Sequence, residues 1–341
     1  MGHPLIPRPR SVEELGGTTA WRRGVVVDSP QWFEIAASFR RDVDASGDPH
    51  DGLERSIVHV REDPHLPAEA YRLTIDGDAV IEASDLAGAA YAVATMEQLI
   101  NADARTLGPD LVEVPRVRIE DGPAWGWRGV HLDVARHFFP VADVCRFVDL
   151  AAQHKLNRVH LHLNDDQGWR VQVPDWPRLT DVGAWRASTP LGAEEDGVDD
   201  GVAYGGFYTS EDLAVIRDFA ASRYVTIVPE VDLPGHAQAV LAAYPELGQA
   251  GVVETWTRWG ISEHVLAPTR AALDFAADAV GYVADLFPCS PVHVGGDECP
   301  TTEWAASDDA RAVMAENGFS EVRQLQGLFT RAMVGAVQDR G

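Results

Sequence analysis

The second part of the chain repeats one pattern four times: a short apolar strand, a loop and then a helix. The four strands are expected at Gly129–Asp133, Arg158–Leu163, Tyr224–Pro229 and Val292–Gly295. The helices that follow the first three are expected at Ala142–His154, Glu211–Ser222 and Arg270–Leu286. Strands that alternate with helices connect by right-handed crossovers and pair as a parallel sheet. Because the strands are short and the loops after them are long, the pattern favours a (β/α) barrel over an open doubly wound sheet.

The number of these units is smaller than a complete barrel requires. A closed (β/α)8 barrel of the TIM type has eight strand–helix units in about 250 residues. Only about the first four units are found between Trp125 and Gly341. No Gly-x-Gly-x-x-Gly follows the first strand, which argues against a dinucleotide-binding sheet. The sequence therefore predicts an α/β fold that contains the N-terminal half of such a barrel.

The first 120 residues show a different pattern, in which short strands are separated by turns. Strands rich in β-branched residues are expected at Gly24–Val27, Ser56–Val60, Tyr71–Ile75 and Ala79–Glu82. A helix is expected over Asp85–Ile100, where apolar residues recur at helical spacing, and a linker over Pro115–Pro123. We therefore expect a small α+β domain at residues 1–120 and the barrel domain at residues 121–341.

The charge balance argues against one class of partner. With 28 basic and 53 acidic residues, the chain has a formal net charge of −25. Because binding to nucleic-acid phosphates needs clustered Lys and Arg, we expect no nucleic-acid partner. No stretch approaches the roughly 18 apolar residues of a membrane span, and no signal peptide is seen, so we expect no membrane partner and a cytoplasmic protein. The three cysteines have neither disulfide-framework nor zinc-site spacing, and we expect no metal or other cofactor.

Charged and polar side chains follow each of the four expected strands. In barrels of this type, functional residues lie at the carboxyl ends of the strands and in the loops just after them. The four strand ends are Asp133–His137, Asn164–Trp169, Glu230–His236 and Gly295–Glu298. Each contains at least one carboxylate, and a parallel sheet brings all four ends to the same edge. The pattern therefore predicts one polar site built from four strand ends.

The neighbouring acids Asp297 and Glu298 are the most informative of these residues. Two adjacent carboxyl groups in a shielded cleft do not both ionise easily, so the pKa of one is raised and that group stays protonated near neutral pH. Glycosidic cleavage needs such a pair, because one acid protonates the leaving oxygen and one carboxylate offsets developing positive charge. The alternative is a solvated pair at the positive end of the next helix. The position after Gly295 and Gly296, at a strand end, favours the glycosidase interpretation.

Two histidines on the second strand have a rival interpretation as metal ligands. His160 and His162 form a His-x-His pair, which metal-dependent hydrolases place at barrel strand ends. Such a site needs further ligands, for which Asp297 and His293 are the candidates. Because both histidines lie inside the strand rather than beyond its end, we prefer packed or hydrogen-bonded core histidines.

Three further residues are candidates for contacts with a substrate. Asp232 and His293 belong to the third and fourth strand regions. Trp169 follows the second strand, where an aromatic face could stack on a sugar ring. Taken singly, Trp169 is better interpreted as ordinary packing, and sugar stacking is the functional alternative.

Five segments resemble the motifs of one enzyme family in the same order. They are Leu132–Phe139, His160–Arg170, Tyr204–Thr209, Pro229–His236 and Val292–Glu298, the last of which contains His-x-Gly-Gly-Asp-Glu. In these motifs the chain resembles the family-20 glycoside hydrolases, the β-N-acetylhexosaminidases. The expected α+β domain also fits the small domain that commonly precedes the barrel of that family.

The resemblance implies a substrate-assisted mechanism with net retention. In this family, the substrate's own 2-acetamido carbonyl attacks the anomeric carbon and forms an oxazolinium-type intermediate. By motif position, Glu298 is implied as the acid that then becomes the base, and Asp297 as the group that holds the acetamido N–H. Arg136 is implied to bind hydroxyls of the terminal sugar. Asp165 and His236 are implied to form a relay that orients the acid.

The resemblance also implies a substrate class. We expect exo-hydrolysis of terminal β-linked N-acetylglucosamine or N-acetylgalactosamine from oligosaccharides, glycoconjugates or chitin fragments. Two alternatives stay open: a lacto-N-biosidase-like glycosidase, and a catalytically inactive sugar-binding remnant of the fold. Since family barrels continue through four more strands, we expect the rest of the barrel to come from a longer protein or from a second chain.

Overall fold

The computed structural model describes residues 4–22, 25–27, 56–102, 105–108, 111–192, 198–249, 251 and 253–340. The chain divides into two compact units. The first unit is Met1–Gly129 with Arg146–Asn157 and Phe219–Val225, and the second is Val130–Cys145, Arg158–Asp218 and Thr226–Gly341. The domain boundary at residues 120–121 remains a prediction from the sequence pattern.

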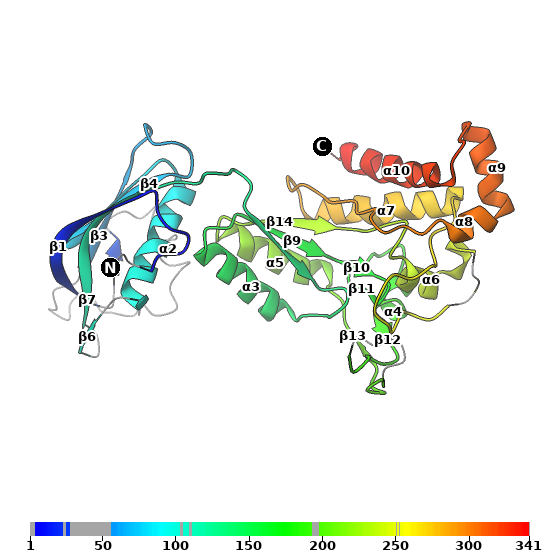
Figure 1. The fold of residues 1–341 in the computed structure, drawn as a ribbon, viewed down its shortest axis with the longest axis horizontal. Helices are drawn as coiled ribbons and strands as arrows, with labels where there is room; N and C mark the ends of the chain where they lie inside the picture. The colour runs from blue at the N-terminus through cyan, green and yellow to red at the C-terminus, as the bar shows by residue number, and fades with distance from the viewer. Residues whose placement is uncertain are drawn as a thin grey trace. The chain divides into compact units, whose positions relative to one another are not determined.

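The first unit contains a mixed sheet with one long helix packed on it (Figure 1). Its strands are β1 (Ser11–Arg22), β2 (Val25–Val27), β3 (Ser56–Glu62), β4 (Tyr71–Asp76), β5 (Asp78–Ala83), β6 (Arg105–Gly108) and β7 (Leu111–Asp121). They are ordered β1-β7-β4-β5-β3-β2, and β6 pairs with β7. Helix α2 (Leu86–Ala102) packs on β4, β5 and β7. The alternating buried residues Leu73, Ile75 and Ile81 form the core beneath the helix, as expected for a sheet with one covered face. The predicted strands and the helix of this region are confirmed, with Gly24 outside the described residues.

The predicted linker at Pro115–Pro123 is wrong for most of its length. Strand β7 continues to Asp121 and pairs antiparallel with both β1 and β4. Its side chains alternate, with Val117 and Ile119 fully buried, so burial on one face decides the structure. Pro115 lies opposite Thr18, next to a register shift in β1, where a strand tolerates a residue without an N–H.

The second part of the chain has the predicted alternation of strands and helices. It contains β8 (Gly129–Asp133), α3 (Val141–Gln153), β9 (Arg158–His162), α5 (Ser210–Ala221), β14 (Thr226–Glu230) and α7 (Arg270–Leu286). The strands form a sheet in the order β14-β9-β8, and β14 pairs with β9 in parallel, from Thr226 opposite Arg158 to Glu230 opposite His162. The α/β architecture expected for the first part of a barrel is therefore present, as an open sheet.

The prediction of a fourth regular strand at Val292–Gly295 is wrong. Its only described pairing is a parallel bridge between His293 and Glu230, at the end of β14. The backbone turns away immediately afterwards, because Gly295 and Gly296 both have positive φ, of 57° and 105°. The segment therefore extends the sheet by one residue. The loop that follows lies at the carboxyl edge, the edge of the sheet at which the parallel strands end.

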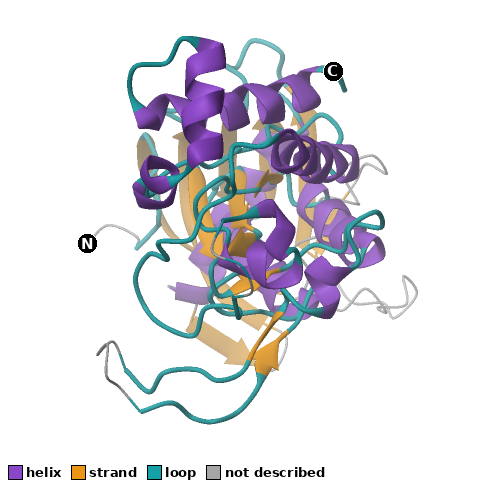
Figure 2. Cartoon of the chain, turned by 90° about the vertical axis from the view of Figure 1, so that its right-hand side faces the viewer, coloured by secondary structure: helices purple, strands orange, loops and turns teal. Residues whose placement is uncertain are grey.

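Further elements surround this sheet. They are β10 (Asn164–Asp165), β11 (Gly168–Trp169), α4 (Arg178–Asp181), β12 (Trp185–Arg186), β13 (Tyr204–Gly205), α6 (Gln238–Ala243), α8 (Thr302–Ala306), α9 (Asp308–Asn317), α10 (Gln326–Gln338) and the 3-10 turns Pro245–Leu247 and Val322–Leu325. Helix α10 packs along α7, as the upper part of Figure 1 shows. The described parts of the segment between β12 and β13, residues 187–192 and 198–203, project at the lower edge of Figure 2. Among the described residues, no helix combines the length and apolar character needed to cross a membrane.

A buried arginine fixes the loops at the carboxyl edge. Arg170 is fully buried, and its guanidinium donates to the carbonyl oxygens of Val134, Ala135, Ala184 and Gly206. Burial lowers the pKa of Arg170 to about 10, so the group stays charged near neutral pH. One cation therefore connects the loop after β8 with the β12 and β13 segments.

Candidate active site

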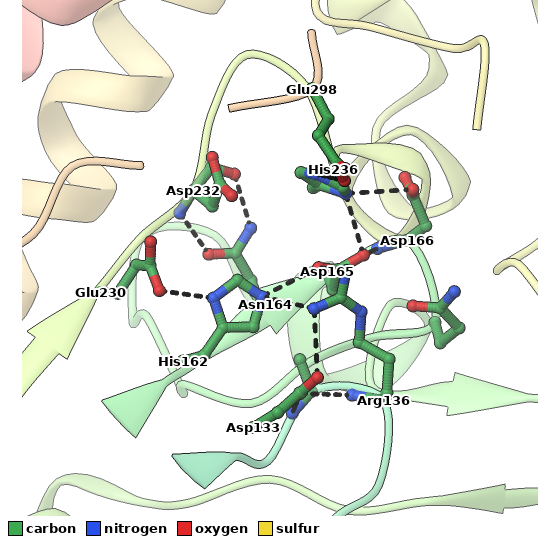
Figure 3. A network of polar contacts seen from close by, with 12 residues as sticks. Asp133, Arg136, His162, Asn164, Asp165, Asp166, Glu230, Asp232, His236 and Glu298 are labelled. Atoms are coloured by element: carbon green, nitrogen blue, oxygen red, sulfur yellow. Dashed lines mark hydrogen bonds and ion pairs between the residues drawn. The ribbon is translucent and has the colours of Figure 1, made fainter. Parts of the chain in front are cut away.

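Polar side chains from three strand ends and from the loop after His293 lie together, and hydrogen bonds and ion pairs join most of them (Figure 3). Its labelled members are Asp133, Arg136, His162, Asn164, Asp165, Asp166, Glu230, Asp232, His236 and Glu298. All of them lie in the second compact unit. The four polar segments predicted from the sequence are therefore brought together.

Arg136 is held by two carboxylates in the turn after β8. Its Nη2 lies 2.7 Å from Oδ2 of Asp165, and its Nη1 donates to Oδ2 of Asp133 at 3.1 Å. Asp133 also accepts the backbone N–H groups of Ala135 and Arg136, so the same carboxylate shapes the turn. Burial lowers the pKa of Arg136, but Asp165 and Asp133 outweigh it, and the net shift is upward. The side chain is 32% exposed, which leaves part of a charged, oriented guanidinium open to a ligand.

Asp165 lies at the centre of the network and is fully buried. Its Oδ2 is 2.8 Å from Nε2 of His162 and also faces Arg136, while its Oδ1 is 3.1 Å from Nδ1 of His236. Burial raises the pKa of Asp165, but the two imidazoles and the guanidinium outweigh it and lower the pKa to about 2. Asp165 is therefore an ionised carboxylate that connects the arginine to the histidine, in the position predicted for a relay.

His236 connects Asp165 to the predicted acid. Its Nδ1 lies 3.1 Å from Asp165 and 3.4 Å from Oδ2 of Asp166, and its Nε2 lies 3.4 Å from Oε2 of Glu298. Burial lowers the pKa of His236, but the carboxylates of Asp165 and Asp166 outweigh it and raise the pKa to about 11. An imidazolium therefore faces Glu298 at neutral pH.

Glu298 is presented by a tight turn. Gly295, Gly296 and Glu298 all have positive φ, and Glu298 itself is at 49°. A Cβ at Gly295 would lie 2.1 Å from Oδ1 of Asp232, so only glycine fits there. The N–H of Gly296 donates to that same oxygen at 2.7 Å, and Gln326 donates to the carbonyl of Gly296. The turn therefore directs the half-exposed Glu298 side chain towards the imidazole.

The carboxyl group with a raised pKa is not where the sequence predicted it. We expected a shielded Asp297–Glu298 pair, but both residues are exposed in this structure. Burial raises the pKa of Asp232 to about 7, the N–H of Gly296 opposes the shift, and Asp297 adds to it. Asn164 fixes Asp232 by hydrogen bonds of 2.8 Å to both its backbone N–H and its carbonyl. Asp232 is therefore a buried carboxyl group that titrates near neutral pH beneath the turn.

Glu230 lies close to four histidines, and the sequence analysis assigned no role to it. Its Oε2 is 2.6 Å from Nδ1 of His162, 2.9 Å from Nε2 of His160 and 3.9 Å from Nε2 of His131. Its Oε1 is 2.7 Å from Nδ1 of His293. His293, a predicted substrate-binding residue, thus contacts this carboxylate. A polar residue at the end of the buried run of β14 was the signal in the sequence.

The same cluster contains the atoms that the metal interpretation needs. Nitrogen and oxygen atoms lie within 4.8 Å of one another in the groups His131, His162, Glu230 and His160, Glu230, His293. Imidazole and carboxylate ligands suit zinc. Asp297, expected as a possible ligand, lies instead with Asp232 and His236. Hydrogen bonds to Glu230 occupy the two strand histidines, which agrees with the preferred core interpretation.

The prediction that Trp169 stacks on a sugar is wrong. The side chain is fully buried, its indole N–H donates to the carbonyl of Val171 at 2.6 Å, and its ring packs near Phe275. The short β10–β11 hairpin turns it into the core. Trp259 is 62% exposed and lines a cavity beside Arg136, so this tryptophan presents an aromatic surface next to the site.

Comparison with known proteins identifies the family of the chain. Residues 125–341 match the model of the glycosyl hydrolase family 20 catalytic domain, and residues 2–122 match domain 2 of the same family. A β-hexosaminidase of Porphyromonas gingivalis is 36% identical over 316 residues, which are 90% of this chain and 39% of that protein. A β-N-acetylhexosaminidase of Cellulomonas fimi is 40% identical over 316 residues, which are 88% of this chain and 60% of that protein.

A solved structure gives the same result for the fold. The family-20 exo-β-N-acetylglucosaminidase of Vibrio harveyi, solved in complex with N-acetylglucosamine, matches with a TM-score of 0.83 and 29% identity. The match covers 99% of this chain and 54% of that one. The chain thus spans about half the length of the relatives it matches. With both family models matched along nearly its entire length, the chain belongs to glycosyl hydrolase family 20.

Proposed function

We propose that the protein is a β-N-acetylhexosaminidase that removes terminal β-linked N-acetylglucosamine or N-acetylgalactosamine. Membership of the family and relatives named as β-hexosaminidases support this activity. The contacts of 3.1 Å and 3.4 Å that link Asp165, His236 and Glu298 carry the proposal. They hold a carboxyl group in a fixed position, and a positioned carboxyl group can protonate a glycosidic oxygen.

The proposed reaction proceeds in two steps with retention. Glu298 donates its proton to the glycosidic oxygen while the carbonyl oxygen of the substrate's 2-acetamido group attacks the anomeric carbon. The bond to the leaving group breaks and an oxazolinium-type intermediate forms. Glu298, now a carboxylate, takes a proton from water as the water opens the oxazolinium ring of the intermediate. The product sugar leaves with the configuration of the substrate.

The surrounding groups have matching roles in this proposal. The imidazolium of His236 lies beside Glu298 and fixes the position of its carboxyl group, which serves first as the acid and then as the base. Arg136 binds hydroxyls of the terminal sugar with its exposed N–H groups. Asp297 accepts the acetamido N–H and offsets the positive charge of the intermediate.

The role of the acetamido group gives the test of this function. The protein should hydrolyse 4-nitrophenyl N-acetyl-β-D-glucosaminide and release the β-anomer first, as followed by proton NMR. It should not measurably hydrolyse 4-nitrophenyl β-D-glucoside, which has the same leaving group and lacks the internal nucleophile. A thiazoline mimic of the intermediate should inhibit competitively. Equal turnover of the two glycosides, or release of the α-anomer, would refute the mechanism.

Three other expectations concern alternative functions, completion of the barrel and location. Neither lacto-N-biosidase-like specificity nor a non-catalytic role is favoured by the named relatives. We propose that a second chain completes the barrel, which size-exclusion chromatography with light scattering would test. The cytoplasmic location is a further proposal, open to cell fractionation.

A further inference from the structure

A second histidine, His162, contacts Asp165 on the side away from Glu298. The Nε2 of His162 is 2.8 Å from Oδ2 of Asp165, and its Nδ1 is 2.6 Å from Oε2 of Glu230 (Figure 3). Side-chain exposure is 6% for His162, 5% for Glu230 and zero for Asp165. Both ring nitrogens of a buried imidazole therefore face carboxylates.

Two carboxylate partners require two protons on the ring. A neutral imidazole has one N–H, which would leave one nitrogen lone pair against a carboxylate oxygen. Burial lowers the pKa of His162, but Asp165 and Glu230 outweigh it and raise the pKa to about 10. The charges therefore alternate from Glu230 through His162 and Asp165 to the imidazolium of His236.

The network fixes the orientation of Asp165 through three cations. His162 and Arg136 share Oδ2, and His236 contacts Oδ1. The Nη1 of Arg136 also lies 3.3 Å from Nε2 of His162, so when Nε2 carries a proton this contact joins two cations, and the carboxylate of Asp165 offsets their charges. Without His162, only Arg136 would fix Oδ2, and the plane of the carboxylate towards His236 would be less defined.

We propose that His162, held by Glu230, is a positioning residue for the proton transfer at Glu298. It keeps Asp165 ionised and oriented, and Asp165 in turn holds the His236 imidazolium against the acid. This inference rests on the proposed hexosaminidase function and deepens it. His162 and Glu230 make no described contact with Glu298, and they act through Asp165.

The charged groups around this pair come from each neighbouring segment. Glu230 of β14 also contacts His160 of β9 and His293, and His131 of β8 lies 3.9 Å from it. The ring of His131 is 5.8 Å from that of His162. His160 therefore provides a control, because it donates to the same oxygen of Glu230 but makes no described contact with Asp165.

The first experiment separates positioning of the acid from general damage. Turnover of N,N'-diacetylchitobiose, whose leaving sugar needs protonation, is compared with that of 2,4-dinitrophenyl N-acetyl-β-D-glucosaminide, whose leaving group does not. His162→Gln and Glu230→Gln should lower kcat for chitobiose by about tenfold more than for the dinitrophenyl substrate. His160→Gln should change that ratio less than about twofold. Equal losses on both substrates in both test variants would show a merely structural role and overturn the proposal.

The second experiment needs no turnover, so it distinguishes this inference from the proposed function. In protein with 15N-labelled histidine, both nitrogens of His162 should carry protons from pH 6 to pH 8. Glu230→Gln should lower the midpoint pH of the His162 titration by at least about one pH unit. His160→Gln should lower that midpoint by clearly less. A neutral His162 at pH 7 in the wild type would overturn the positioning role. Absence of hydrolysis with a doubly protonated His162 would instead count against the hexosaminidase function alone.

Discussion

The Nε2 atom of His236 lies 3.4 Å from Oε2 of Glu298, and both residues have a left-handed backbone, with φ of 48° and 49°. Such a backbone is uncommon for residues other than glycine and persists only where the surroundings enforce it. Asp165 and Asp166 hold the imidazole, and the glycine turn holds the acid. The fold therefore fixes this contact against the local preference of both residues, which is typical of a functional pair.

The shape of the Arg136 guanidinium predicts the effect of replacing it by lysine. Arg136→Lys keeps a positive charge but loses the planar set of N–H groups that reaches Asp133, Asp165 and a sugar together. KM for 4-nitrophenyl N-acetyl-β-D-glucosaminide should rise about tenfold or more. Arg270→Lys, at an exposed position of α7, is the control and should leave KM unchanged. A KM for Arg136→Lys within about twofold of wild type would contradict the binding role.

The raised pKa of Asp232 predicts a pH-dependent stability. The unfolded chain releases this proton near the ordinary pKa of 3.8, and the folded chain releases it near 7. The unfolded state therefore binds fewer protons between these values, and the free energy of unfolding falls as the pH rises from about 4 to 7. Asn at this position still accepts the N–H of Gly296 but carries no charge.

Asp232→Asn should therefore gain stability relative to wild type as the pH rises. Between pH 4 and pH 8, the difference in the free energy of unfolding should shift in favour of the variant by about 1–4 kcal/mol. Urea denaturation at both pH values measures it. A difference that is constant with pH, or that moves in favour of the wild type, would show that Asp232 ionises normally in the fold.

The turn before Glu298 predicts that one glycine is indispensable. A Cβ at Gly295 would meet the carboxylate and backbone of Asp232, and φ is 57°. Gly295→Ala should lower kcat by about tenfold or more, because a displacement of about 1 Å at a reacting group costs that much. Gly335→Ala in α10, where a Cβ meets nothing within 4 Å, should keep full activity and stability. Full activity in Gly295→Ala would mean that the turn does not position the acid.

The burial of Trp169 predicts a loss of stability rather than a loss of binding. Trp169→Ala removes a fully buried indole and its hydrogen bond to Val171, and should lower the free energy of unfolding by about 3–5 kcal/mol. Trp185→Ala, at a side chain that is 46% exposed, should cost much less. Chemical denaturation compares the two. A stable Trp169→Ala protein with a raised KM would restore the sugar-stacking role.

The elements that could be predicted from the sequence are those with a strong local period. Helix α7 begins and ends where predicted, at Arg270 and Leu286, because apolar residues recur on one face and Thr269 caps its start. Strand β8 was likewise predicted at Gly129–Asp133. Pairing between strands that lie far apart in the sequence could not be predicted from a local period. Proline at both ends made residues 115–123 resemble a linker, but pairing with β1 and β4 makes most of them a strand.

The site was predictable in part, from the positions of its residues in the sequence motifs. The motif positions of Arg136, Asp165, His236 and Glu298 identified residues that the structure connects. The raised pKa at Asp232 was not predictable, because it depends on burial and on the turn that folds over it. The burial of Trp169 depends in the same way on a two-residue hairpin whose direction no local pattern specifies.

The most direct test of the central claim is the turnover of N,N'-diacetylchitobiose by the protein and by its Glu298→Gln variant. The glutamine keeps the size of the side chain but has no proton to donate. We predict that kcat falls by about 10²–10⁴-fold while the circular dichroism spectrum is unchanged. Turnover by Glu298→Gln equal to that of the wild type would contradict the assignment of this residue as the acid.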